Sequence, residues 1–112
     1  MTITKTDSEV RFEYRDLYAG LIRLHILHHA AEGPIFGLEM AEELARHGYR
    51  ISPGTLYPLL HGLEKRGYLR SAEVRKGQSI RKVYRATSLG KKALQAMRVK
   101  VGELFGELNE KK

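Results

Sequence analysis

The stretch ISPGTLYPLLHGLEKRGYL, from Ile51 to Leu69, decides the fold that we expect for this chain of 112 residues. It opens with Ser52-Pro53, where serine is a preferred helix N-cap and proline suits the first helical position because its missing N–H would have no partner there. Gly67 is expected to close this helix. Leucines at helical spacing predict its inward face: Leu56, Leu59, Leu60 and Leu63.

Two more helices are expected upstream. One is predicted from Leu38 to Arg46 with Gly48 as its left-handed stop, and a longer one from Phe12 to Ala31, ended by Gly33-Pro34. The apolar face of the longer helix is expected to contain Tyr14, Leu17, Tyr18, Leu21, Leu24 and Leu27, with Ile22 and Ile26 widening it. A short connection between the second and third helices predicts a helix-turn-helix.

A basic hairpin is predicted directly after the helix-turn-helix. Two β-like segments, 68–74 and 80–87, flank the glycine-containing loop 75–79. Residues 65–92 hold ten Lys or Arg against one acid, a balance of +9, whereas the whole chain carries +7. Positive charge concentrated in one segment indicates a polyanionic partner, although charged strands also protect an exposed sheet edge.

The last helix is expected from Leu89 to Leu108. Its apolar residues follow steps of three and four, which is typical of a seam that pairs with another helix. We therefore predict a homodimer formed through Leu94, Met97, Val101, Leu104, Phe105 and Leu108. The expected fold is mainly α with a small β wing: a flexible arm (1–10), a winged helix-turn-helix DNA-binding domain (11–87), and a dimerisation helix with a short tail (88–112).

The face of the third helix opposite its leucines is predicted to read double-stranded DNA. Hydroxyl, aromatic and imidazole groups reach base edges or phosphates, and flexible Arg and Lys suit phosphates or a narrow minor groove. The candidate residues are Ser52, Gly54, Thr55, Tyr57, Pro58 and His61 on the helix, with Arg70, Arg75, Lys76, Arg81 and Lys82 on the hairpin. Pro58 inside a helix is an anomaly eased by Gly54, and Tyr57 is equally consistent with a half-buried core position.

The Ile51–Leu69 stretch, together with RKVYRATSLGKKAL from Arg81 to Leu94, resembles the PadR family of transcriptional regulators. The resemblance implies a winged helix, a two-fold dimer built largely from terminal helices, and repression by promoter occlusion. It also implies DNA-reading roles for Ser52, Gly54, Thr55, Tyr57 and Pro58, and a wing over 75–82. Family members often have a tryptophan beside an effector pocket at the dimer interface; this chain has none, and Phe105 is the candidate to replace it.

Two alternatives stay open beside DNA binding. His25, His28 and His29 are spaced to place two imidazoles on one helical face, so a metal- or small-molecule-responsive sensor using His25 and His29 is one. A winged helix used for protein contacts is the other. The chain lacks cysteine, a long apolar run and a recognisable catalytic motif, so we expect a cytoplasmic protein with no membrane segment, no cofactor and no enzymatic activity.

Overall fold

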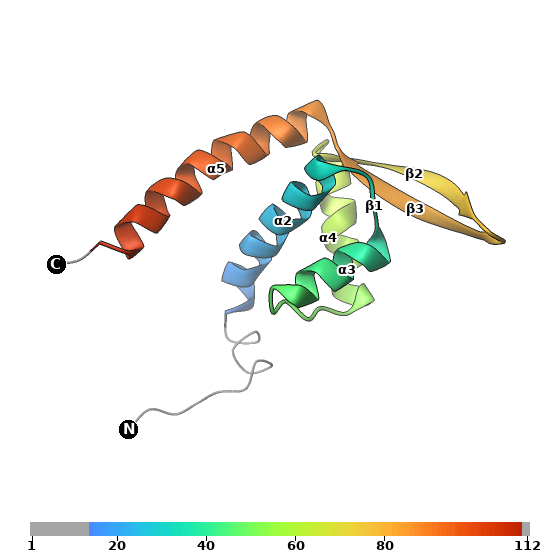
Figure 1. Cartoon of the computed structure of the whole chain (residues 1–112), viewed down its shortest axis with the longest axis horizontal. Coiled ribbons are helices and arrows are strands. Elements are labelled where there is room, and N and C mark those ends of the chain that lie inside the picture. Colours follow the sequence, from blue (N-terminus) through green and yellow to red (C-terminus); the bar gives the residue numbers. More distant parts are fainter. Residues whose placement is uncertain (1–13, 111–112) are drawn as a thin grey trace, which may run out of the picture.

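The computed structural model describes residues 14–110, which form four helices and a three-stranded sheet (Figure 1). In chain order these are α2 (Arg15–Glu32), β1 (Ile35–Phe36), α3 (Gly37–Arg46), α4 (Pro53–Lys65), β2 (Leu69–Lys76), β3 (Ser79–Ala86) and α5 (Ser88–Leu108). The four helices and the hairpin expected in this range are confirmed. The expected arm over residues 1–10, the helix start near Phe12 and the end of the tail lie outside the described residues.

The core lies where α2, α3 and α4 meet the base of the hairpin (Figure 1). Leu56, Leu60 and Leu63 are buried as predicted, whereas Leu59 is only partly buried. The helix α4 continues through Pro58 to Lys65. The remaining buried apolar side chains of this core come from all the packed elements: Ile22, Ile26, Leu27, Ala30, Met40, Leu44, Leu69 and Tyr84.

The sheet is antiparallel in the order β1-β3-β2. The short strand β1 was not predicted, because two residues carry no readable alternation. The predicted loop over 75–79 was also wrong in its bounds: Lys76 pairs with Ser79, so only Gly77-Gln78 connect the strands. Gly77 has a φ of 65°, and glycine at the first position of a two-residue turn is what a type II′ hairpin requires.

The junction between β3 and α5 is held by Thr87. Its hydroxyl accepts a hydrogen bond from the N–H of Gly90 at 3.0 Å and donates one to the carbonyl of Gly67. Gly90 is buried so tightly that a Cβ there would lie 2.1 Å from the carbonyl oxygen of Tyr68. This contact fixes the first turn of α5 against the end of α4.

Beyond that first turn, α5 runs away from the core and gives the molecule extents of 55 × 31 × 21 Å (Figure 1). The predicted inward face of α2 is only partly correct: Ile26 and Leu27 are buried, but Tyr14, Leu17 and Leu21 are exposed. In the described residues, none of the helices is both long enough and apolar enough to cross a membrane.

Candidate nucleic-acid interface

The N-terminus of α4 is built as the Ser-Pro signal predicts. Ser52 has the extended backbone of an N-cap, and its carbonyl accepts hydrogen bonds from Thr55 and Leu56, both at 2.9 Å. The hydroxyls of Ser52 and Thr55 lie 3.4 Å apart, and neither is buried. A Cβ at Gly54 would meet only the Ser52 hydroxyl, at 3.7 Å, so this first turn is sterically open to an approaching ligand. Five predicted reading residues of α4 and its N-cap are exposed: Ser52, Gly54, Thr55, Pro58 and His61.

Tyr57 is half-buried, as one of its two interpretations from sequence allowed. Its side chain is 40% exposed, yet its ring covers Gly37 at the start of α3, where a Cβ would lie 2.8 Å from the Tyr57 hydroxyl. The small residue at position 37 therefore lets the tyrosine ring lie flat between the two helices of the helix-turn-helix. Tyr57 positions α4 on α3 and still presents an edge to solvent.

The exposed side of α4 and the hairpin border one recess of about 500 Å³. Tyr57 and His61 line it from α4, while Arg81 and Lys82 line it from β3, with further walls from Phe36, Gly37, Leu38, Ile80 and Tyr84. The two elements predicted to contact DNA thus lie side by side, a juxtaposition that sequence spacing alone does not show.

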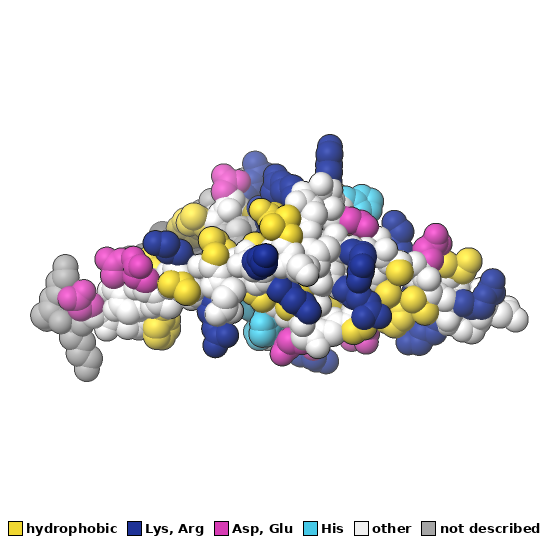
Figure 2. Space-filling view, turned by 90° about the horizontal axis from the view of Figure 1, so that it is seen from above, with side chains coloured by type: hydrophobic (Ala, Val, Ile, Leu, Met, Phe, Trp, Pro, Cys, Tyr) yellow, Lys and Arg dark blue, Asp and Glu magenta, His cyan; other side chains and the backbone are white. Residues whose placement is uncertain are grey.

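The predicted hairpin cations divide between the two faces of the ribbon. Antiparallel register places Arg70, Lys76 and Arg81 on one face, and Arg75 and Lys82 on the other. Figure 2, viewed from above, shows Lys and Arg side chains spread over this projecting part of the molecule. A hairpin with cations on both faces can touch nucleic-acid backbone on either side of its tip.

The hairpin has a large excess of positive charge, since Glu73, which lies opposite Lys82, is the acidic residue of β2 and β3. Within residues 14–110, the ion pairs lie on α2, α3 and α5, and no hairpin cation takes part in one. The Lys76 ammonium lies 4.8 Å from the centre of the Phe36 ring, a cation–π contact that orients the side chain and leaves its charge intact. The hairpin therefore keeps a net positive charge that attracts anions.

A polar contact missed by sequence reasoning ties the hairpin to α4. The Glu64 carboxylate accepts hydrogen bonds from the Ser71 hydroxyl at 2.6 Å and the Ser71 N–H at 3.2 Å. Beneath it, Tyr84 is fully buried, and burial, then Glu64 and then Tyr57, raises the pKa of its hydroxyl. These contacts fix the angle between the hairpin and α4.

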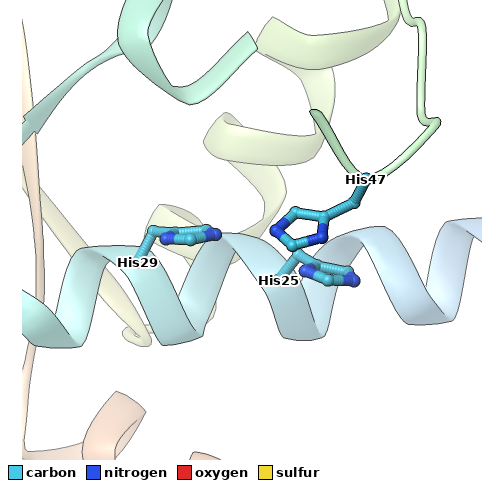
Figure 3. A group of neighbouring side chains, drawn as sticks. All are labelled: His25, His29 and His47. Atoms are coloured by element: carbon cyan, nitrogen blue, oxygen red, sulfur yellow. The ribbon is translucent and has the colours of Figure 1, made fainter. Parts of the chain in front are cut away.

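The histidines of α2 do gather with others, but the sequence analysis missed one member. His25 and His29 lie on the side of α2 that faces His47, which follows α3 (Figure 3). The ring centroids of His25 and His47 are 4.7 Å apart. Burial, followed by the neighbouring His47, His29 and His28, lowers the pKa of His25 below its ordinary value.

Three of the residues predicted to form a dimer, Leu94, Met97 and Val101, line a second hollow, of about 540 Å³, between α2 and α5. Leu94 packs partly against the core of its own chain. The other predicted dimerisation residues are exposed on α5: Met97, Val101, Leu104, Phe105 and Leu108. Leu21 and Leu24 of α2 line the same hollow, which explains why that apolar face is not in the core.

The transcriptional regulator PadR-like family matches residues 26–96, which covers most of the chain. The chain belongs to the PadR-like family. It is a transcriptional regulator and not an enzyme, in agreement with the prediction from sequence. A curated relative, transcriptional regulator Rv3488 of Mycobacterium tuberculosis, is 48% identical over 94 residues, spanning 84% of this chain and 88% of the relative.

Solved structures give the same fold for this PadR-like regulator. A PadR family transcriptional regulator from Eggerthella lenta superposes with a TM-score of 0.76 at 32% identity, covering 95% of this chain and 96% of that one. Bacillus subtilis PadR in complex with operator DNA superposes with a TM-score of 0.62 at 20% identity, covering 69% of this chain and 46% of that one. The winged-helix prediction is confirmed.

Proposed function

We propose that this PadR-like regulator binds a palindromic DNA operator as a homodimer and represses transcription by occluding the promoter. The observation that carries the proposal is the shared recess, which Tyr57 and His61 of α4 line together with Arg81 and Lys82 of the basic hairpin. In this arrangement α4 enters the major groove and the hairpin grips the adjacent backbone. The fold shared with the DNA-bound Bacillus subtilis PadR supports this assignment. Such a protein acts where the DNA is, in the cytoplasm.

The homodimer is the second part of the proposal. The exposed seam of α5 and the outward side of α2 form an apolar surface that a second copy would cover, and small chains gain stability from such burial. A two-fold dimer would present its two α4 helices to successive major grooves, about 34 Å apart. The hollow between α2 and α5 is then the place for a small-molecule effector, in which Phe105 of the partner chain replaces the tryptophan common in the family.

The salt dependence of DNA binding tests the electrostatic part. If a dimer neutralises about 6–8 phosphates, the logarithm of affinity falls with the logarithm of salt concentration at a slope of about −5 to −7. Fluorescence anisotropy with labelled duplexes measures this slope. A flat response would instead favour a winged helix that contacts proteins.

Variants of residues at the recess distinguish contacts to DNA bases from contacts to the DNA backbone. Pro58→Ala and Tyr57→Phe should weaken operator binding more than random-duplex binding, and Tyr57→Phe keeps the ring that covers Gly37. Arg81→Ala should weaken binding to both duplexes by a similar factor, because phosphate contacts carry no sequence information. Lys100→Ala is the matched control, since this exposed cation lies on α5, which runs away from the hairpin (Figure 1). Equal losses from all three test variants would contradict this division.

Footprinting on the DNA upstream of the regulator's own gene tests the complete proposal. A symmetric protected patch is expected, with two half-sites about one helical turn apart. An asymmetric or absent patch would overturn the two-fold arrangement.

A further inference from the structure

We propose that His25, His29 and His47 form a binding site for a divalent transition metal of the zinc class, which links α2 to the end of α3. The three residues come from two elements and point toward one another (Figure 3). One potential ligand nitrogen from each lies within 4.8 Å of the other two. The site is distinct from the DNA recess, and it belongs to no part of the proposed DNA-binding function.

The geometry needs little adjustment to hold an ion. Tetrahedral zinc with Zn–N bonds of about 2.0–2.1 Å brings its ligand nitrogens to about 3.4 Å from one another. From separations of at most 4.8 Å, small rotations of the three imidazoles close the site. His25 and His29 are one helical turn apart on α2, a spacing that places two imidazoles on one helical face, and their ring centroids lie 6.3 Å apart.

One buried nitrogen in the cluster lacks a hydrogen bond to any described residue. Nε2 of His29 is buried and has no hydrogen-bond partner among the described residues. A buried polar atom without a partner is costly and calls for a ligand or an ion. On the other side of the ring, Nδ1 of His29 lies 3.5 Å from a carboxylate oxygen of Glu32. A carboxylate beside the second nitrogen is the usual outer partner of a metal-bound histidine, and it directs Nε2 to the metal.

A second group, formed by His28, His29 and Glu32, shares His29 but fits less well. All three residues lie within one turn of α2, and the side chains of His28 and Glu32 are 56% and 64% exposed. In that group His29 would bind through Nδ1, leaving its buried Nε2 unpaired. The group with His47 satisfies both nitrogens of His29, so we assign the metal to it.

The donor set determines which metals fit. Three neutral imidazoles without thiolate suit zinc, nickel or copper, whereas magnesium requires oxygen ligands. The fourth position is open to water or to Glu43, whose carboxylate lies 3.9 Å from Nε2 of His29 and is paired with Arg46.

The place of the site in the fold implies a regulatory effect. His47 ends α3, and only the turn from Gly48 to Ile51 separates it from the N-cap of α4. Tyr49 of that turn packs on Tyr18 of α2, with ring centroids 5.7 Å apart. A metal bound to α2 and His47 would therefore hold α4 at one angle to α2 and α5. We expect it to change operator affinity, a consequence that rests on the proposed DNA-binding function.

Calorimetric titration of the chelator-treated full chain with zinc chloride tests the site. We expect one zinc ion per chain and no response to magnesium. His47→Gln and His25→Gln should weaken zinc binding by about tenfold or more, since loss of even an outer partner costs about 10–100-fold. His28→Gln is the matched control and should bind zinc as the wild type does. Cobalt(II) absorption in the visible range, together with unchanged far-ultraviolet circular dichroism, would show that the variants are folded and lack only the ligand.

Three results would overturn the assignment. They are no zinc binding by the wild type, wild-type affinity in His47→Gln, or loss of binding in His28→Gln while His47→Gln retains it. Operator affinity is then measured with and without zinc for the wild type and for His47→Gln. A zinc effect confined to the wild type supports the regulatory link, and equal affinities refute it. Failure to bind DNA in any state would instead refute the proposed function and leave the metal titration valid.

Discussion

The helices α4 and α5 have similar apolar patterns and opposite fates. In α4, Leu56, Leu60 and Leu63 are all buried by the chain's own elements. In α5, Gly90 is the buried residue among the 21 of the helix, and Leu104 is 53% exposed. An apolar stripe therefore indicates that a face will be covered, but not whether the cover comes from the same chain. The predictions below test this contrast, from the largest expected effect to the smallest.

The largest effect is expected in α4. Leu60 is fully buried at the centre of the core, so Leu60→Ala should lower the free energy of unfolding by about 2–5 kcal/mol, through lost burial and a residual cavity. Urea denaturation followed by circular dichroism measures it. Val99→Ala on α5 is the control, because Val99 is 64% exposed and lies outside the seam, and its change should stay within about 0.5 kcal/mol. A similar loss of unfolding free energy in both variants would contradict the contrast between α4 and α5.

At the junction between β3 and α5, a substitution in α5 should lower the stability of the fold, as a core substitution in α4 does. Gly90→Ala puts a Cβ against the backbone carbonyl of Tyr68, which cannot rotate away, so the first turn of α5 must shift. Overpacking of this kind costs about 1–3 kcal/mol. The same denaturation assay measures it, and wild-type stability in Gly90→Ala would show that the close contact is not maintained in solution.

The seam should affect assembly and leave the monomer fold intact. Leu104→Lys places a charge in the proposed dimer contact and should weaken self-association by about 2 kcal/mol, or about 30-fold. Sedimentation equilibrium measures the association constant. Lys100→Ala serves as the control on the same helix. Unchanged association in Leu104→Lys would mean that the α5 seam is not the dimer contact.

The smallest expected effect is a gain in stability, at Gly102 of α5. A Cβ at Gly102 meets nothing within 4 Å, so Gly102→Ala should stabilise α5 by up to about 1 kcal/mol through helix propensity. Thermal unfolding at several protein concentrations measures it. A loss that grows with concentration would show instead that a partner helix approaches this glycine closely.

Local signals were sufficient to predict most of the fold. The Ser52-Pro53 start, the leucine spacing of α4 and the glycine stop at Gly48, which has a φ of 86°, act within a few residues of one another, so the sequence displays them directly. The strand β1 was missed because its pairing with Tyr84 and Val83 lies nearly fifty residues away. The exposure of Leu17 was missed because the helical pattern does not distinguish a buried apolar face from an exposed one.

The candidate site also has features that the sequence predicts and features that it does not. Exposure of the reading face of α4 follows from helical geometry once its leucines are placed inward. His61 and Lys82 line one recess, and His47 lies beside His25, because of how distant elements pack. No spacing rule in the sequence predicts either arrangement. The cover that Tyr57 gives Gly37 belongs to the same class, since an absent side chain leaves no pattern in the sequence.

The tight contact at Gly90 makes α5 a lever. From Gly90 to Leu108 the helix is about 27 Å long, so a tilt of about 5° at its root moves its far end by about 2 Å. In a two-fold dimer joined along this helix, both subunits would tilt, so the change in distance between the two α4 helices would be twice that of one subunit. A substitution at the root of the lever would then change which half-site spacing is preferred, without altering any residue that touches DNA.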